Sequence, residues 1–234
     1  MTRSTRIVIP ARNEEASIAL VLDEIPRDLV DEVIVVDNGS TDNTAAVARA
    51  HGATVLSETE PGYGAACLRG IAHTSDDTDV VVVLDGDHSD YPEDLGAILA
   101  PIAAGEADFV VGSRVLGEAE PGALPWNQRW GNWLAALMIR ALYRRRFTDM
   151  GPFRAMRREH LLAWEMRDRT YGWNVEMHAK AIIFGSRIVE VPVRYRRRIG
   201  QSKISGTVKG TILAGTKIIW TILKYYPAYL RGKW

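Results

Sequence analysis

The chain has 234 residues, enough for one large α/β domain or two small ones. It is 47% hydrophobic and 25% charged, a globular composition that excludes an intrinsically disordered chain. Basic and acidic residues balance at 29 each, so the overall charge shows no nucleic-acid-binding signature and no nucleic-acid partner is expected.

The first 114 residues alternate short apolar runs with helical patterns. Strands are expected over 6–10, 32–36, 53–56, 79–84 and 108–111, with helices around 18–25, 45–48, 65–73 and 93–103. Strands and helices that alternate at such short intervals predict a parallel, doubly wound sheet.

The run at 79–84 is the most informative of these strands, because it ends in Asp85, Gly86 and Asp87. Side chains two residues apart on an extended chain point the same way, so the two carboxylates can converge beyond the carboxyl edge of the sheet, where α/β sheets bind ligands. Adjacent carboxylates repel unless a cation lies between them. The pattern therefore favours a divalent metal site completed by ligand phosphates over a solvated acidic turn.

Two other strand ends carry polar groups, Asp37 and Arg114, and both belong on the same edge of the sheet. The first strand is not followed by Gly-x-Gly-x-x-Gly, which disfavours a dinucleotide redox cofactor. A Gly-Lys-Ser/Thr phosphate loop is also absent from the sequence, which disfavours a P-loop nucleotide hydrolase.

The second half has a different character. Residues 126–139 predict a helix with tryptophans at one end and arginines at the other, which suits either a membrane-interface helix or a core helix with a solvated basic end. A strand is expected around 153–156, a helix over 171–184, an edge strand over 187–195 and a basic loop over 196–203. Residues 204–234 predict an amphipathic, surface-binding helix.

Compartment and membrane topology follow from what the sequence lacks. Cys67 is the single cysteine, so an internal disulfide is excluded and a reducing compartment is expected. The first residues lack the apolar core of a signal peptide, and no stretch of about 18 uncharged apolar residues predicts a spanning helix.

Seven motifs in this order resemble the family 2 glycosyltransferases with a GT-A fold, and within them the polyprenyl-phosphate sugar transferases of the dolichyl-phosphate mannose synthase branch. The resemblance covers nearly the whole chain. The motifs are residues 9–14 (IPARNE), 35–42 (VVDNGSTD), 61–64 (PGYG), 84–87 (LDGD), 112–114 (GSR), 151–154 (GPFR) and 200–203 (GQSK).

The resemblance implies a GT-A catalytic domain over 1–203, with a nucleotide-binding half over about 1–114 and an acceptor-side half over about 115–203. An amphipathic helical segment would follow over 204–234. The expected architecture is a Rossmann-like, mostly parallel sheet with helices on both faces.

The resemblance also implies residue roles. Asp85 and Asp87 would hold Mg²⁺ or Mn²⁺ against the donor diphosphate, and Arg114 would face the phosphates across the reaction centre. The implied nucleotide site further contains Pro10, Arg12, Glu14, Asp37, Gly39, Gly64 and Gly86. The implied acceptor-phosphate site contains Arg198, Ser202 and Lys203, with the functional arginine of 196–198 left open.

Two positions depart from the pattern of the branch. The branch commonly has two acids at positions 37 and 38, but this chain has Asn38 at the second. The implied nucleotide-binding role is therefore assigned to Asp37 alone. Ser89 stands where a glutamine is common, which leaves the third protein ligand of the metal open.

The implied reaction is inverting transfer of a hexose from a nucleotide-diphosphate sugar, of the GDP-mannose or UDP-glucose type, to polyprenyl phosphate. A lipid phosphate has a second pKa of about 6, so it is already largely anionic and needs no general base. A hydroxyl acceptor would need one, and Asp149 is the candidate for that role or for holding a sugar hydroxyl. Asp87, Arg114, Asp149 and Lys203 are therefore the expected catalytic residues.

We expect a peripheral protein on the cytoplasmic face of a membrane. A homo-oligomer is compatible with this location. The alternatives are a family 2 transferase with a soluble hydroxyl acceptor and a non-catalytic nucleotide-sugar binding protein. A nucleotidyltransferase is disfavoured because its usual glycine-rich first loop is missing from the sequence.

Overall fold

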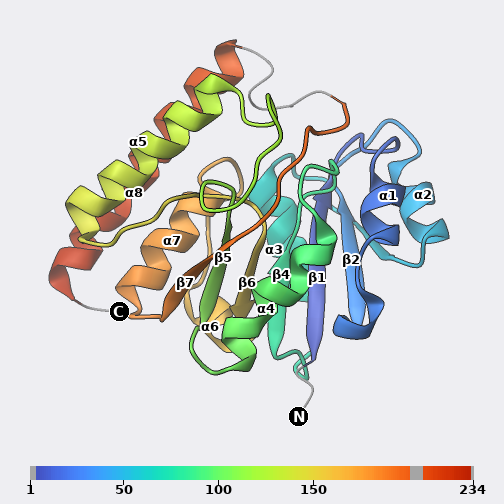
Figure 1. Ribbon diagram of the computed structural model, residues 1–234, viewed down its shortest axis with the longest axis horizontal. Coiled ribbons are helices and arrows are strands. Elements are labelled where there is room, and N and C mark those ends of the chain that lie inside the picture. The colour runs from blue at the N-terminus through green and yellow to red at the C-terminus, as the bar shows by residue number, and fades with distance from the viewer. Residues whose placement is uncertain (1–3, 201–207, 233–234) are drawn as a thin grey trace.

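A computed structural model of the chain describes residues 4–200 and 208–232, with side chains in the last helix from residue 213 onward. Its centre is a seven-stranded sheet in the order β3-β2-β1-β4-β6-β5-β7 (Figure 1). The strands are β1 (Thr5–Ala11), β2 (Glu32–Asp37), β3 (Thr54–Ser57), β4 (Val80–Val83), β5 (Phe109–Ser113), β6 (Arg154–Arg157) and β7 (Ile188–Pro192).

The sheet is mostly parallel, as the sequence predicts. β1 pairs in parallel with β2 and β4, β2 with β3, and β5 with β7. β6 is the exception, because it runs antiparallel to both β4 and β5. β4 and β5 therefore keep the same direction, and all strands but β6 end at one edge of the sheet. This arrangement confirms that Asp37, Asp85 and Arg114 follow strand ends on one edge.

Helices cover both faces of the sheet, and alternate strand residues pack against them. Ile7 and Ile9 of β1 face α1, α2 and α4, whereas Val8 faces α3, α6 and α7. This period of two is the expected pattern of a strand buried on both faces. The helices of these two layers are α1 (Ile18–Asp23), α2 (Thr44–Ala50), α3 (Tyr63–His73), α4 (Leu95–Ala103), α6 (Arg158–Ala163) and α7 (Trp173–Ile183).

Helices α5 (Trp126–Tyr143) and α8 (Val208–Arg231) lie side by side at the edge of the molecule and pack on α7 (Figure 1). Their shared core contains Ile139 and Tyr143 of α5, Ala179 of α7, and Ile222 and Tyr225 of α8. α5 is thus a packed helix along one face, while its tryptophans are exposed on another. No helix among the described residues is long and apolar enough to cross a membrane.

The structure differs from the sequence prediction in three elements. The predicted helix over 93–103 begins as a 3₁₀ turn, Pro92–Asp94, before α4, and a second 3₁₀ turn covers Arg27–Leu29. The short helix α6 was not predicted, because its two leucines are adjacent and show no helical spacing. β7 is an edge strand, as Pro192 indicates.

Candidate active site

The two carboxylates after β4 lie in a buried environment. Tyr63 of α3 donates a hydrogen bond from its hydroxyl to Asp85 Oδ1 at 3.0 Å. Asp87 accepts the backbone N–H of Ser89 at 2.9 Å and forms an ion pair with Arg198. Burial, together with the nearby charge of Asp87, raises the pKa of Asp85 to about 7. The protein therefore holds two acidic groups together at a cost that a cation would relieve.

These residues fit a divalent cation bound jointly with a ligand. The described part of the chain contains no group of three His, Cys, Asp or Glu side chains able to hold a metal on their own. Two carboxylates with the remaining positions filled by ligand phosphates and water is the usual arrangement for Mg²⁺. Asp85 and Asp87 supply that donor set, and the nearby Ser89 hydroxyl is hydrogen-bonded to Asp87.

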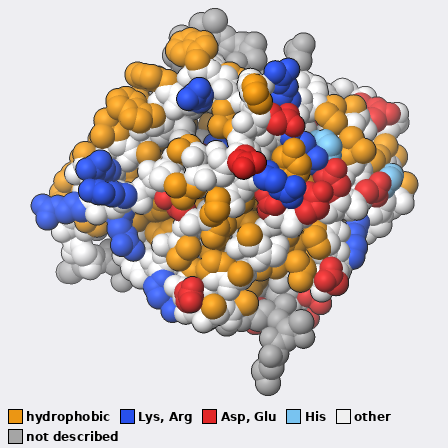
Figure 2. All heavy atoms as spheres, viewed as in Figure 1, with side chains coloured by type: hydrophobic (Ala, Val, Ile, Leu, Met, Phe, Trp, Pro, Cys, Tyr) orange, Lys and Arg blue, Asp and Glu red, His pale blue; other side chains and the backbone are white. Residues whose placement is uncertain are grey.

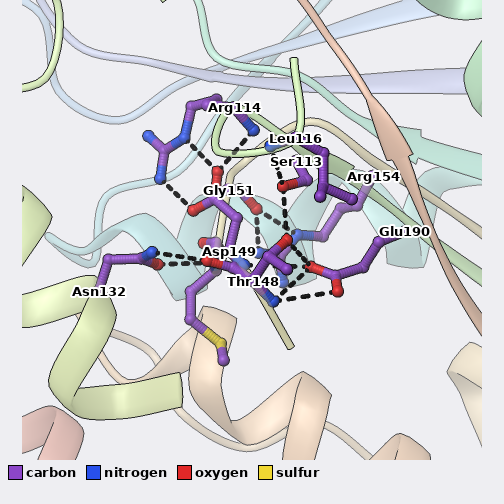
Figure 3. Close-up of polar contacts among 10 residues, drawn as sticks. Ser113, Arg114, Leu116, Asn132, Thr148, Asp149, Gly151, Arg154 and Glu190 are labelled. Atoms are coloured by element: carbon purple, nitrogen blue, oxygen red, sulfur yellow. Dashed lines mark hydrogen bonds and ion pairs between the residues drawn. The ribbon is translucent and has the colours of Figure 1, made fainter. Parts of the chain in front are cut away.

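Arg114, just after β5, is held by Asp149 (Figure 3). Its backbone N–H and Nε donate to Asp149 Oδ2 at 2.8 and 2.7 Å, and Nη2 donates to Oδ1 at 2.7 Å. Burial raises the pKa of Asp149, but the adjacent guanidinium outweighs it and holds that pKa below its usual range. Both oxygens of Asp149 are thus engaged by Arg114, which is the geometry of a positioning residue rather than of an available general base.

The segment that carries Asp149 is fixed from two sides (Figure 3). Asn132 of α5 accepts the N–H of Met150 at 2.8 Å and donates to the carbonyl of Thr148 at 3.1 Å. Glu190 of β7 accepts the N–H of Thr148 at 2.9 Å and that of Asp149 at 3.1 Å. α5 and β7, which the sequence assigns only to the acceptor side, therefore set the position of the arginine at the strand end.

The arginine run 196–198 divides into three different environments. Arg196 pairs with Glu24 and donates to the carbonyl of His88 at 2.7 Å. Arg197 donates to the carbonyl of Pro121 at 2.8 Å. Only Arg198 of the three forms an ion pair with Asp87 in the described residues. Of the three arginines, Arg198 therefore lies next to the carboxylate pair.

Ser202 and Lys203, the other two residues predicted for the acceptor phosphate, lie outside the described residues.

Asn38 explains one departure from the family pattern. Its side-chain amide donates to the carbonyls of Glu58 and Glu60 at 3.1 and 2.7 Å, and its Oδ1 accepts the N–H of Gly62 at 2.8 Å. A carboxylate has no donor for the two carbonyls. Asn38 thus fixes the loop after β3, while the carboxylate of Asp37 beside it accepts the N–H of Ser40 at 3.1 Å.

One glycine predicted for the nucleotide site is required by the fold itself. A Cβ on Gly64 would lie 2.1 Å from the carbonyl oxygen of Asp168. A Cβ on Gly86, in contrast, would make only ordinary contact with Ile18 and Ile9 at 3.4 Å. Gly39 differs, because its φ of +72° requires a residue that tolerates the left-handed region and the space around it is open.

The remaining nucleotide-site residues lie at the same edge. Pro10 is near the end of β1, and Arg12 and Glu14 follow in the loop to α1. Ser17 links this loop to the carboxylate turn, because its hydroxyl donates to Glu14 Oε2 at 3.1 Å and is 2.9 Å from the carbonyl of Gly86.

Sequence reasoning missed three residues at this edge. Both carboxyl oxygens of Asp90 are buried and lack a hydrogen-bond partner within the described ranges. Burial and the charges of Asp85 and Asp87 raise the pKa of Asp90 well above its usual range. The second is Tyr63, which donates the hydrogen bond to Asp85. The third is Tyr195, whose ring centroid lies 4.9 Å from the guanidinium carbon of Arg114. A sequence signal exists only for Asp90, which is the third acid in the DGDHSD turn.

A mostly parallel sheet with paired carboxylates after its central strand and arginines opposite them defines a glycosyltransferase of the GT-A class. The family model described as "Glycosyl transferase family 2" matches residues 6–163. An uncharacterized glycosyltransferase of Mycobacterium tuberculosis is 39% identical over 212 residues, covering 89% of this chain and 93% of the relative. An undecaprenyl-phosphate mannosyltransferase of Micrococcus luteus is 33% identical over 217 residues, covering 87% and 88%.

Among solved structures, this chain is similar to glucosyl-3-phosphoglycerate synthase from Mycobacterium tuberculosis. The complex with phosphoglyceric acid is 27% identical at a TM-score of 0.78, and the match covers 96% of this chain and 80% of that one. The same synthase was crystallised with Mn²⁺, UDP and glucosyl-3-phosphoglycerate, and that structure matches at a TM-score of 0.77. The chain belongs to family 2 of the glycosyltransferases, as its motifs indicate.

Proposed function

We propose that the chain transfers a hexose from a nucleotide-diphosphate sugar to a polyprenyl phosphate at the cytoplasmic face of a membrane. The observation that carries the proposal is the pairing of opposite charges at one sheet edge. Asp85 and Asp87 supply the negative side, and Arg114 and Arg198 supply the positive side. A donor diphosphate with its cation and an anionic acceptor are the two charged partners that such an edge suits.

On the donor side, Asp85 and Asp87 would hold Mg²⁺ or Mn²⁺. The cation, when bound, would stabilise the negative charge that develops on the departing diphosphate. Arg114 would stabilise the same charge, because Asp149 keeps its guanidinium fixed and the ring of Tyr195 supports it. The orphaned carboxyl of Asp90 is a neighbouring group whose missing hydrogen-bond partner a bound sugar hydroxyl would supply.

On the acceptor side, Arg198 is proposed to bind the acceptor phosphate together with Ser202 and Lys203. Its contact with Asp87 brings a cation next to the carboxylate pair, where an anionic acceptor would approach the sugar. A phosphate that is already ionised needs no general base. The absence of a free base on Asp149, whose oxygens are engaged by Arg114, suits this chemistry.

The relatives support a lipid acceptor more than a soluble one. The chain is 30% identical over 223 residues to a polyprenol monophosphomannose synthase of Mycolicibacterium smegmatis. The exposed tryptophans of α5 suit an enzyme that works on a lipid surface. The second candidate is transfer to a soluble acceptor, which is favoured by the structural similarity to glucosyl-3-phosphoglycerate synthase.

The test is transfer of radiolabelled sugar into a butanol-extractable lipid. The purified chain is incubated with polyprenyl phosphate and Mn²⁺ or Mg²⁺, with GDP-mannose and UDP-glucose in parallel reactions. Labelled lipid from one donor supports the proposal and identifies the nucleotide. Donor turnover that labels phosphoglycerate but not lipid would favour the second candidate, and a chain inert towards every acceptor would favour a binding protein.

A pair of variants ties activity to the carboxylate site. Asp87→Ala should abolish transfer while the thermal midpoint of unfolding stays close to that of the parent. Asp76→Ala removes a fully exposed carboxylate and should change neither quantity. Retained turnover in Asp87→Ala would contradict the metal assignment.

A further inference from the structure

The turn after α5 carries three successive arginines, Arg144, Arg145 and Arg146, all exposed. No hydrogen bond or ion pair of their guanidinium groups is found among the described residues. Seven arginines elsewhere behave differently, because each has an acidic partner: Arg114, Arg157, Arg158, Arg187, Arg194, Arg196 and Arg198. The arginine turn is therefore a concentration of uncompensated positive charge.

The turn borders a hollow of about 380 Å³. The hollow is lined by Arg144, Arg145, Arg146, Phe147, Ile188 and Glu190. Glu190 offsets only part of this charge, and its carboxylate accepts hydrogen bonds from Thr148 and Asp149 rather than from an arginine. The lining thus combines a net positive charge with an apolar wall, which suits a phosphate group attached to something hydrophobic.

An apolar ridge leads up to this turn along α5. Its members are Trp126, Trp130, Trp133 and Leu137, which are 80%, 58%, 57% and 42% exposed. Their spacing of four, three and four residues places them on one side of the helix. Figure 2 shows hydrophobic side chains along the upper left of the molecule, where α5 runs in Figure 1, and Lys and Arg side chains gathered below them at its edge.

The neighbouring helix α8 extends the same surface. It exposes Leu213, Trp220, Leu223 and Leu230. Its last turns lie beside the arginine turn, because the ring of Tyr143 at the end of α5 lies 5.0 Å from that of Tyr229. Residues 126–146 contain five arginines and residues 208–231 four basic residues, and neither stretch contains an acid. In a chain with no net charge, these two stretches therefore carry basic side chains and no acidic ones, although Lys217 pairs with Asp168 of a neighbouring segment.

We propose that the arginine turn is a binding site for the phosphate headgroups of anionic phospholipids, separate from the site of the polyprenyl phosphate that reacts. The inference rests on the proposed action at a membrane surface. Tryptophans on an amphipathic helix insert at the headgroup level, and arginines beside them meet the negative surface of the leaflet. The combination of an apolar ridge and basic side chains without acids complements an anionic bilayer better than a neutral one.

The experiment is co-sedimentation of the full chain with vesicles of phosphatidylcholine, with and without phosphatidylglycerol, in the absence of donor and polyprenyl phosphate. The parent should bind the anionic vesicles more tightly, and salt should weaken that binding. Arg145→Gln with Arg146→Gln should weaken it roughly 25-fold, since each basic residue near an anionic surface contributes about fivefold. The matched control, Arg49→Gln with Arg69→Gln, removes the same charge from exposed positions on α2 and α3 and should bind like the parent.

Several results would overturn the proposal. One is equal binding by the two double variants, which would make the arginine turn a solvated helix end. Another is equal affinity of the parent for neutral and anionic vesicles, which would leave binding to the tryptophans alone. A third is release from vesicles by inorganic phosphate well below the equivalent ionic strength of sodium chloride, which would indicate a site for free anions. Because no reactants are present, failure of the proposed transfer reaction leaves these readouts unchanged.

Discussion

At the scale of single residues, Asn38 shows how a departure from a family pattern acquires a physical reason. The amide bridges three backbone groups of the loop after β3, and two of those contacts need a donor. Asn38→Asp should therefore lower the free energy of unfolding by about 1–2 kcal/mol, because two partly buried carbonyls lose their donor and face a carboxylate. Urea titration measures the change, and an unchanged free energy of unfolding would show that the amide does not fix the loop.

His178 contributes to the pH dependence of the stability of the fold. Its ring is buried between Phe109 and Phe147, with centroids 5.5 and 4.7 Å away. Burial, with a contribution from the charge of Arg154, lowers the pKa of His178 to about 3. The unfolded chain titrates near 6.5, so it binds more protons than the folded chain between those values. Stability is therefore complete above about pH 6.5 and is lost as the pH falls towards 3.

His178→Phe should remove this part of the acid sensitivity. As the pH falls through that window, His178 lowers the free energy of unfolding of the parent by up to about 1.4 kcal/mol per pH unit. The variant should lack this contribution, so its free energy of unfolding should fall less steeply with pH. Thermal unfolding followed from pH 7 to pH 4 gives the two slopes. His73→Gln, a change at a more exposed histidine, should keep the slope of the parent. Parallel slopes for the parent and His178→Phe would show that the imidazole is charged in the folded state.

The candidate site was predictable only where a residue type and a strand end coincide. Asp37, Asp85, Asp87 and Arg114 each follow an apolar run, so the parallel-sheet rule brings them together. Asp90 and Tyr195 come from different segments, which pair as an isolated bridge that no local pattern encodes. Glu176 of α7 is likewise fixed by a contact in the fold, because it is buried in an ion pair with Lys180 one helical turn further on.

At the scale of elements, β1, β2, β4 and β5 were predictable because their apolar runs are buried on both faces. The antiparallel direction of β6 was not predictable, since four residues give no sign of which neighbours they join. The position of α3 depends on a contact that sequence reasoning assigned to a nucleotide. Gly62 and Gly64 lie against the chain at Asp168 and Arg169, and the N–H of Ala65 donates to the carbonyl of Arg169 at 3.0 Å.

Two helical glycines provide a test of this packing. Gly64→Ala should lower the free energy of unfolding by about 3 kcal/mol or more, because its Cβ would lie 2.1 Å from a backbone oxygen. Gly131→Ala, in α5 with nothing within 4 Å of its Cβ, should raise it by about 1 kcal/mol through helix propensity alone. Urea unfolding of both variants measures the difference. Equal effects would show that α3 does not pack against residues 168–169.

At the scale of the whole molecule, the two sides of the sheet have different surfaces. The edge formed by β3 and β2 is flanked by short helices, whereas the β7 edge carries the paired helices α5 and α8 (Figure 1). Both of these helices expose tryptophans. The sequence predicted amphipathic character for both helices but could not tell which side each would bury. Their mutual contact and their contact with α7 settle this, because they turn Ile139, Tyr143 and Ile222 inward.

This asymmetry distinguishes the two acceptor classes. Replacing Trp126, Trp130 and Trp133 with serine should weaken binding to vesicles by about tenfold per tryptophan, since each partly buried ring contributes about 1.5 kcal/mol. The change should also reduce transfer to polyprenyl phosphate embedded in those vesicles. Binding of the nucleotide diphosphate should not change, because these side chains are exposed and take part in none of the contacts of Asp85, Asp87 and Arg114. Leu20→Ser with Leu162→Ser, at exposed positions on α1 and α6, provides the control.

The outcome for the tryptophan variant bears on the whole reaction. A lipid acceptor requires the chain to reach a phosphate that remains in the bilayer, so loss of the ridge should reduce transfer from vesicles much more than transfer to acceptor dispersed in detergent. A soluble acceptor makes no such demand, and the variant would then match its parent in both assays. The contradicting result is equal transfer on vesicles by all three proteins: the parent, the tryptophan variant and the leucine control. That result would show that transfer does not depend on membrane binding by α5, and it would favour a soluble acceptor.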